Sequence, residues 1–111
     1  MRTDIADAST QGTARPAATP SRALRGLIRQ AILAPSPCNL QPWRFAIRGD
    51  AVLVFLDDSR RLHWSDRTGR QATIAIGCAV ENLCIAASAI GLETEVAGFP
   101  EDEVAPVVAR A

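Results

Sequence analysis

The spacing of apolar residues predicts a helix over residues 19–34. Apolar side chains recur at intervals of three, one, three and one, as in an amphipathic helix: Leu24, Leu27, Ile28, Ala31 and Ile32. Thr19 suits the N-cap and Pro20 the first helical position, while Pro35 ends the helix. The opposite face carries Arg22, Arg25 and Arg29. We interpret this cationic row as the solvated face, although it could also bind a phosphate.

Strict alternation replaces the helical period over residues 43–48, where every second residue is large and apolar. The turn Gly49-Asp50 follows and leads into residues 51–56. This pattern predicts a two-stranded hairpin. The second strand is apolar enough to predict burial on both of its faces.

A second helix is predicted to begin around Thr68-Gly69 and to end at Gly91. It is apolar nearly all round, and one other helix can cover only one of its sides. We therefore expect a sheet, together with a partner chain or a missing segment, to cover the rest. Gly77 in its interior costs about 1 kcal/mol relative to alanine, which a close backbone contact across an interface would offset.

The remaining segments complete one domain over residues 19–111. A short strand is predicted over residues 93–98, and a third helix over residues 104–111 after an acidic triplet. Residues 1–18 are rich in alanine, threonine and serine with scattered charges. Because such a segment buries little apolar surface, we expect a disordered tail there.

Composition describes an ordinary soluble protein of 111 residues, with 48% hydrophobic and 22% charged residues. The formal net charge of zero gives no electrostatic reason to expect nucleic acid or an anionic membrane as partner. No run approaches the roughly eighteen uninterrupted apolar residues of a membrane span. The three cysteines without CxxC spacing fit a reducing compartment. We predict a cytoplasmic protein with no nucleic-acid or membrane partner.

The sequence contains no recognisable catalytic set. It lacks a glycine-rich phosphate motif, and its only histidine, His63, has no second ligand at helical spacing, so we expect a surface residue and no metal site. Cys78 and Cys84 suit small core positions. Cys38 follows a helix end, an environment that does not favour a thiolate. Catalytic residues stay unknown, and any reactive chemistry would come from a bound cofactor.

The segment APSPCNLQPWRF, residues 34–45, combines a helix stop, a rigid polar loop and a strand start. Three prolines fix φ and remove three backbone donors: Pro35, Pro37 and Pro42. Neutral groups that both donate and accept hydrogen bonds come from Ser36, Asn39 and Gln41. Such a loop suits a planar heteroaromatic ligand. The alternative is a tight turn that satisfies only its own backbone.

This segment resembles the APSxxNxQPW signature of the nitroreductase-like flavoprotein family. Further blocks are similar, in order, to the Acg-type branch of that family: residues 57–62 resemble its D-x-x-R-x-L turn, and residues 66–70, 76–83 and 89–92 follow. The resemblance covers about residues 20 to 111. It implies an α+β sandwich, with an antiparallel sheet flanked by helices and a long central interface helix.

The resemblance also implies FMN as cofactor, bound at the interface of a dimer. A nicotinamide donor, NAD(P)H, would reduce FMN, and a nitro, quinone or enone compound would accept the electrons. The cofactor-binding positions carried over are Pro35, Ser36, Pro37, Asn39 and Gln41, and Trp43 falls at the packing position behind the loop.

Three departures from the family pattern matter. Cys38 stands where the Acg-type pattern has histidine, and Pro37 removes a backbone N–H. The phosphate-binding arginines have no clear counterpart, although Arg22 or Arg25 is conceivable. Family domains are longer, so we expect an N-terminal half that pairs with a second copy or with a missing second half.

Three functional alternatives remain open from the sequence. The first is an FMN-dependent oxidoreductase, or half of one. The second is a non-catalytic flavin-binding or dimerisation module. The third is an unrelated partner-binding module built on Trp43, Trp64 and the apolar helix.

Overall fold

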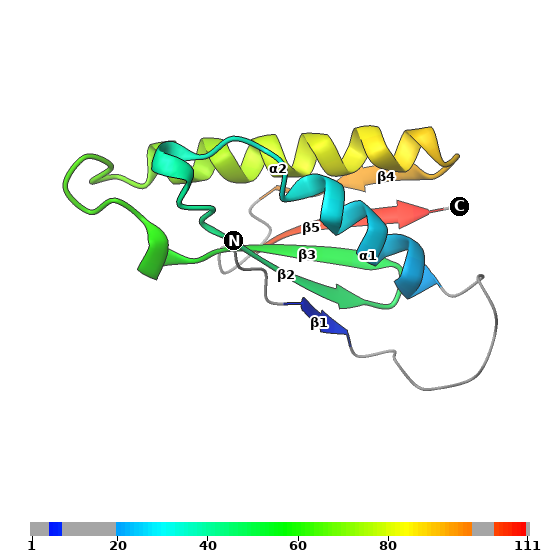
Figure 1. Cartoon of the computed structure of the whole chain (residues 1–111). Helices are drawn as coiled ribbons and strands as arrows, with labels where there is room; N and C mark the ends of the chain where they lie inside the picture. The colour runs from blue at the N-terminus through cyan, green and yellow to red at the C-terminus, as the bar shows by residue number, and fades with distance from the viewer. Residues whose placement is uncertain (1–4, 8–19, 99–103, 111) are drawn as a thin grey trace.

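The chain forms a five-stranded sheet with two helices packed against it (Figure 1). The structure is a computed structural model and describes residues 5–7, 20–98 and 104–110. Its elements, in chain order, are β1 (Ile5–Asp7), α1 (Pro20–Ala31), the 3-10 turn η1 (Pro37–Asn39), β2 (Trp43–Arg48), β3 (Ala51–Leu56), the 3-10 turn η2 (Asp58–Arg60), α2 (Arg70–Ala89), β4 (Glu93–Val96) and β5 (Val104–Arg110).

The strand order in the sheet is β1-β2-β3-β5-β4. β2 and β3 form the predicted hairpin, with Trp43 opposite Leu56 and Arg48 opposite Ala51. Gly49 in the connecting turn has a φ of +60°, which glycine adopts without steric cost. β5 pairs antiparallel with β3 and β4, whereas β1 runs parallel to β2. The predicted antiparallel sheet is therefore confirmed apart from its β1 edge.

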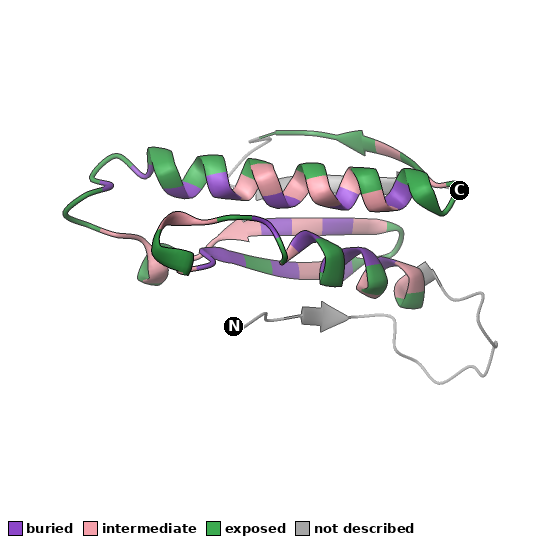
Figure 2. Ribbon diagram, turned by 45° about the horizontal axis from the view of Figure 1, so that its top comes forward, coloured by how far each residue is buried: buried purple, intermediate pink, exposed green. Residues whose placement is uncertain are grey.

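The core lies between the sheet and the helices, which pack on one face of it (Figure 2). The hairpin contributes five side chains that are each 2% exposed or less: Trp43, Phe45, Ile47, Val52 and Val54. The predicted stripe of α1 faces them, with Leu24, Leu27, Ile28 and Ala31 buried and Ile32 partly buried. The apolar face of α1, which repeats every 3.6 residues, thus packs against the apolar face of the hairpin, which repeats every two residues.

The long helix α2 is confirmed, but only one of its faces is buried. The residues on that face are small, apart from one leucine: Ala72, Ala75, Ala79, Leu83 and Ala87. Ile74 and Ile85 are more than half exposed. By length and composition α2 would also suit a membrane span, and in the described part of the chain it is the one helix that does. Core helices of soluble proteins have the same composition.

Two predictions about the chain ends need correction. Residues 104–110 form the strand β5 and not a third helix, and β-branched Val104, Val107 and Val108 favour that strand. Ile5–Asp7 lie within the segment predicted as a disordered tail, yet they pair with β2 as β1. The rest of that segment and the proposed N-cap Thr19 lie outside the described residues.

The prediction that the second hairpin strand is buried on both faces is also wrong. Val52 and Val54 are buried, whereas Ala51, Leu53 and Phe55 are only half-buried. Both helices pack on the face that carries the two valines, and so the other face keeps partial contact with solvent. Cys78 and Cys84 are likewise half-buried residues that pack against the core.

Candidate functional site

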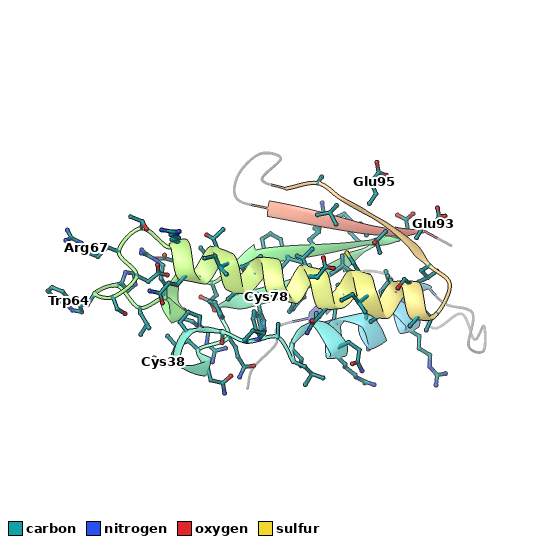
Figure 3. All side chains as sticks on the ribbon, turned by 90° about the horizontal axis from the view of Figure 1, so that it is seen from above. Cys38, Trp64, Arg67, Cys78, Glu93 and Glu95 are labelled. Carbon is teal, nitrogen blue, oxygen red and sulfur yellow. The ribbon has the colours of Figure 1, made fainter. Side chains whose placement is uncertain are left out.

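A groove of about 280 Å³ separates the loop after α1 from the first half of α2. The loop lines it with Pro35, Ser36 and Pro37. The helix lines it with Gln71, Ile74, Ala75 and Cys78. In Figure 3 the loop that carries Cys38 runs beside α2, which carries Cys78. The groove is mainly apolar and has neutral polar groups from one serine and one glutamine.

The loop holds an unusual backbone conformation. Cys38, Asn39 and Gln41 all have positive φ, at 49°, 53° and 52°. A left-handed conformation costs an L-residue about 1 to 2 kcal/mol, and asparagine tolerates it best of the three. Such strain persists only where surrounding contacts determine the conformation, which is common at ligand sites.

Hydrogen bonds within the loop maintain this conformation. The backbone N–H of Gln41 donates to Ser36 Oγ at 2.9 Å, and Gln41 Nε2 donates to Asn39 Oδ1 at 3.3 Å. The N–H groups of Asn39 and Leu40 donate to the carbonyl oxygens of Ser36 and Pro37, both at 3.0 Å. The polar groups therefore shape the loop first and leave only part of their capacity for a ligand.

Two polar atoms beneath the loop are buried without a hydrogen-bond partner among the described residues. They are Gln41 Oε1 and Trp43 Nε1. Such groups are uncommon in folded proteins and mark places where a water molecule, a ligand or another segment supplies a partner. Trp43 otherwise fills the core behind the loop, in the packing position expected for it.

A second loop, residues 57–69, braces the first. The Asp57 N–H donates to the Pro42 carbonyl at 2.9 Å, and Arg60 reaches the Gln41 carbonyl at 3.5 Å. Arg61 donates through Nε to Asp58 Oδ1 at 2.7 Å, and through its terminal nitrogen to the carbonyls of residues 66 and 67 at 2.8 and 2.9 Å. One guanidinium group thus holds both ends of the second loop.

Asp66 joins this loop to the start of α2. Its carboxylate oxygens accept the N–H groups of Gln71 and Ala72, each at 2.9 Å. Burial by itself would raise the pKa of Asp66, but those two N–H groups, the Arg61 charge and the Arg70 N–H outweigh it, so the pKa lies below its ordinary value. The ionised carboxylate therefore accepts hydrogen bonds from the free N–H groups in the first turn of α2, whose N-cap residue provides no side-chain hydrogen bond.

The structure brings together three of the five predicted cofactor-binding residues. Pro35, Ser36 and Pro37 line the groove, whereas Asn39 is exposed and Gln41 is buried beneath the loop. Sequence reasoning missed the α2 side of the groove and the bracing role of the second loop. The alternation of Asp58, Arg61 and Asp66 charges around a turn was the available signal for that role.

The other candidate residues lie elsewhere. His63 is exposed, as expected, with Nε2 3.9 Å from Asp58 Oδ2. Cys38 is exposed. Arg22 lines a separate groove of about 420 Å³ between α1 and the far end of α2, and so it does not face Ser36. Within the described ranges no group of three or more histidine, cysteine, aspartate or glutamate side chains could hold a metal ion.

Several known proteins with similar sequences come from Mycobacterium tuberculosis. A candidate NAD(P)H nitroreductase named acg is 34% identical over 77 residues, which are 69% of this chain and 23% of that protein. A second candidate NAD(P)H nitroreductase is 28% identical over 78 residues, or 70% of this chain and 23% of that protein. The match therefore spans less than a quarter of these curated relatives. No protein-family model matches the chain.

Two solved structures share the fold. A candidate nitroreductase from Desulfovibrio desulfuricans, in complex with FMN, superposes with a TM-score of 0.66 and 25% identity, covering 80% of this chain and 72% of that one. A candidate nitroreductase from Thermotoga maritima gives a TM-score of 0.60 at 20% identity, covering 81% of this chain and 35% of that one. The α+β sandwich expected from the sequence is therefore confirmed.

Proposed function

Because the chain is nitroreductase-like in both sequence and fold, we propose that it is part of an FMN-dependent oxidoreductase. NAD(P)H would supply the electrons and a nitro, quinone or enone compound would accept them. The observation that carries this proposal is the groove that Ser36, between two prolines, lines together with four residues of α2, three of them apolar or weakly polar: Gln71, Ile74, Ala75 and Cys78.

The described residues suit the ring system of FMN better than its phosphate. The groove offers apolar walls with a hydroxyl and an amide side chain, as sites for planar ligands commonly do. Its volume of about 280 Å³ lies near the lower end of ligand pockets, which begin at roughly 300 Å³. None of its lining residues is cationic. The phosphate partner would have to come from another segment or another chain.

The residues of this chain would bind and orient the cofactor. Ser36 already accepts one hydrogen bond from Gln41 N–H, and its hydroxyl hydrogen can point elsewhere. Pro35 and Pro37 fix the backbone on either side of it. Asn39 is exposed and can offer its amide nitrogen. When bound, FMN supplies the redox chemistry, and the protein contributes position and hydrogen bonds.

A second polypeptide surface would complete the site, supplied by a second copy of the chain or by a missing second half. Ile74 belongs to the groove and is more than half exposed, as is Ile85 farther along α2. Gly77 is exposed between them, and an added Cβ there would meet no described atom within 4 Å. A close backbone approach at that point would therefore involve a surface outside the described residues.

A non-catalytic flavin-binding or dimerisation module is the second candidate. None of the described residues that line the groove is cationic, and this favours the module over an enzyme site that is complete within the described chain. The two candidates differ in turnover. Purified full-length chain titrated with FMN, then supplied with NADH or NADPH and a nitroaromatic or quinone, distinguishes them. Flavin binding with acceptor-dependent NAD(P)H oxidation supports the oxidoreductase, and flavin binding without turnover supports the module.

The side chain of Asn39 provides a sharper test. If it contacts FMN, Asn39→Ala should weaken FMN binding by about 1 to 3 kcal/mol, measured by calorimetry, while circular dichroism stays unchanged. Asn82→Ala is the matched control, because its amide lies on α2 and contacts the Gln30 carbonyl at 3.4 Å. Equal FMN affinity in the two variants would refute the assignment of Asn39. A chain that takes up no FMN would refute a flavin site formed by this chain or by two copies of it.

A further inference from the structure

The two faces of the sheet differ in what covers them. Both helices pack on the face that carries the buried side chains of Val52 and Val54 (Figure 2). A sheet face that stays in solvent normally carries polar side chains. The opposite face of this sheet instead has half-buried apolar residues at its centre: Ala46 on β2, and Ala51, Leu53 and Phe55 on β3. A contiguous apolar patch on a surface marks a contact with another molecule.

The strand registers extend this second face over four strands. Ala51 and Leu53 pair with residues 108 and 106 of β5, a valine and a proline, and residue 108 pairs in turn with Glu95 of β4. Directly paired residues share a face of a sheet, as do residues two apart on one strand. We define the open face as residues 44, 46 and 48 of β2, 51, 53 and 55 of β3, 104, 106 and 108 of β5, and 93 and 95 of β4.

The two outer strands of the open face carry opposite charges. Arg44 and Arg48 are exposed on β2, and Glu93 and Glu95 are exposed on β4. Figure 3 shows both glutamates projecting from β4 away from α2. One row of paired residues runs from Arg48 through β3 and β5 to Glu95. In the order β2-β3-β5-β4, the two charged strands therefore lie at equal distances on either side of an apolar centre.

We infer that a second copy of the chain packs on the open face. A rotation of 180° about an axis along the strands, between β3 and β5, lays β2 of one copy across β4 of its partner. Arg48 then lies opposite Glu95 of the second copy, and the two-fold symmetry makes this contact twice. An axis across the strands would instead place arginine against arginine, which costs several kcal/mol. Because the face is complementary to itself, a second copy fits it better than an unrelated partner does.

The size of the open face indicates how tightly two copies associate. Four strands about 4.8 Å apart, with about six residues of about 3.4 Å each, give roughly 400 Å² per copy. Two such faces bury roughly 800 Å², which is less than the roughly 1,200 Å² where stable interfaces begin. We therefore expect a dimer that forms at micromolar concentration, with the sheets aligned to within about 30°. The charge pairs fix its orientation.

Sedimentation equilibrium of the full-length chain without flavin, over the micromolar range, tests this dimer. Arg48→Glu and Glu95→Arg should each raise its Kd about tenfold, since each change acts twice in a two-fold interface. An equimolar mixture of the two variants should associate about as tightly as the parent, because opposite charges then face each other again. The control Arg67→Glu should stay within twofold of the parent. Arg67 projects with Trp64 at the other end of the molecule from Glu93 and Glu95 (Figure 3).

The outcomes separate this inference from the proposed function. A chain that stays monomeric would overturn the inference, and a further segment of a longer protein on this face would produce that result. A dimer unchanged by either reversal would also overturn it, as would a mixture that stays as weak as the single variants. Dimerisation of a chain that takes up no FMN would support the inference and refute a flavin site formed by one or two copies. FMN uptake by a monomer would do the reverse.

Discussion

The loop that lines the groove and the second loop, which braces it, differ in the conformation of their backbone. The loop at residues 35–42 places left-handed backbone on Cys38, Asn39 and Gln41, and a buried amide oxygen beneath it has no partner among the described residues. In the loop at residues 57–69 the residue with left-handed backbone is Gly69. The buried carboxylate of this loop, Asp66, accepts two backbone N–H groups of α2. We call residues 57–69 the relaxed loop and residues 35–42 the strained loop. The relaxed loop supports the strained loop through hydrogen bonds, and the strained loop forms one wall of the groove.

This difference indicates which loop is built for a ligand. A left-handed non-glycine residue costs folding free energy, and the second loop avoids that cost. The first loop carries it three times within four residues, while its neighbour supplies bracing contacts at Pro42 and Gln41. Damage to the relaxed loop should therefore unfold more of the molecule, and damage to the strained loop should remain closer to the groove.

The largest effect is expected at Asp66. Because folding lowers the pKa of this carboxyl below its ordinary value of 3.8, the ionised form stabilises the fold above about pH 4. That contribution is lost as the pH falls through the folded-state pKa. Asp66→Asn removes the charge and leaves one N–H of α2 facing an amide nitrogen. We expect a lower Tm at pH 7 and a smaller loss of Tm on acidification, measured by circular dichroism.

The control for this variant is Glu81→Gln, which removes an exposed carboxylate in the middle of α2. Its Tm should follow the parent protein across the same pH range. If Asp66→Asn retained the acid sensitivity of the parent, Asp66 would not be the group that couples acid to unfolding. The bracing role given to the second loop would then lose its main support.

Ser36→Ala should have the next largest effect and tests the strained loop. It removes the acceptor of the Gln41 N–H, and an unsatisfied, largely buried donor costs about 1 to 3 kcal/mol. We expect the free energy of unfolding in urea to fall by that amount. Ser59→Ala, in the exposed turn of the second loop, should change it by about 0.5 kcal/mol or less. Equal effects would mean that the Ser36 hydroxyl does not hold the loop.

Much of this architecture is predictable from local pattern. The helix of Leu24 and Ile28 and the hairpin around Gly49 follow from side-chain period and turn residues, because their partners in the core are close in sequence. β5 was missed because it pairs with β3, about fifty residues earlier in the chain. An acidic triplet before valines and alanines resembles a helix start, and only the distant partner strand decides otherwise.

One wall of the candidate site was likewise predictable from local sequence pattern, and the other was not. Its loop wall was identifiable because prolines and neutral polar residues cluster at Pro35, Ser36 and Pro37. The α2 wall was not, since Ile74 and Cys78 have the spacing of ordinary core residues and only the tertiary packing turns them toward the loop. The buried capping role of Asp66 depends on how residues 61–72 fold back, which sequence spacing alone does not specify.

The smallest effect on the free energy of unfolding is expected when a glycine with left-handed backbone, Gly69, is replaced by alanine. A glycine in a regular helix, Gly77, serves for comparison. Gly69→Ala forces an L-residue to a φ of +75° and places its Cβ 3.4 Å from Arg61 Cδ, which should cost about 1 to 2 kcal/mol. Gly77→Ala is the matched control, because its φ is helical and the added Cβ meets no described atom, so the isolated chain should gain about 1 kcal/mol. Chemical denaturation measures both changes. If both variants changed the free energy of unfolding by the same amount and in the same direction, the conformation of Gly69 would not be what distinguishes the relaxed loop. Weaker self-association in Gly77→Ala would place a partner surface against α2.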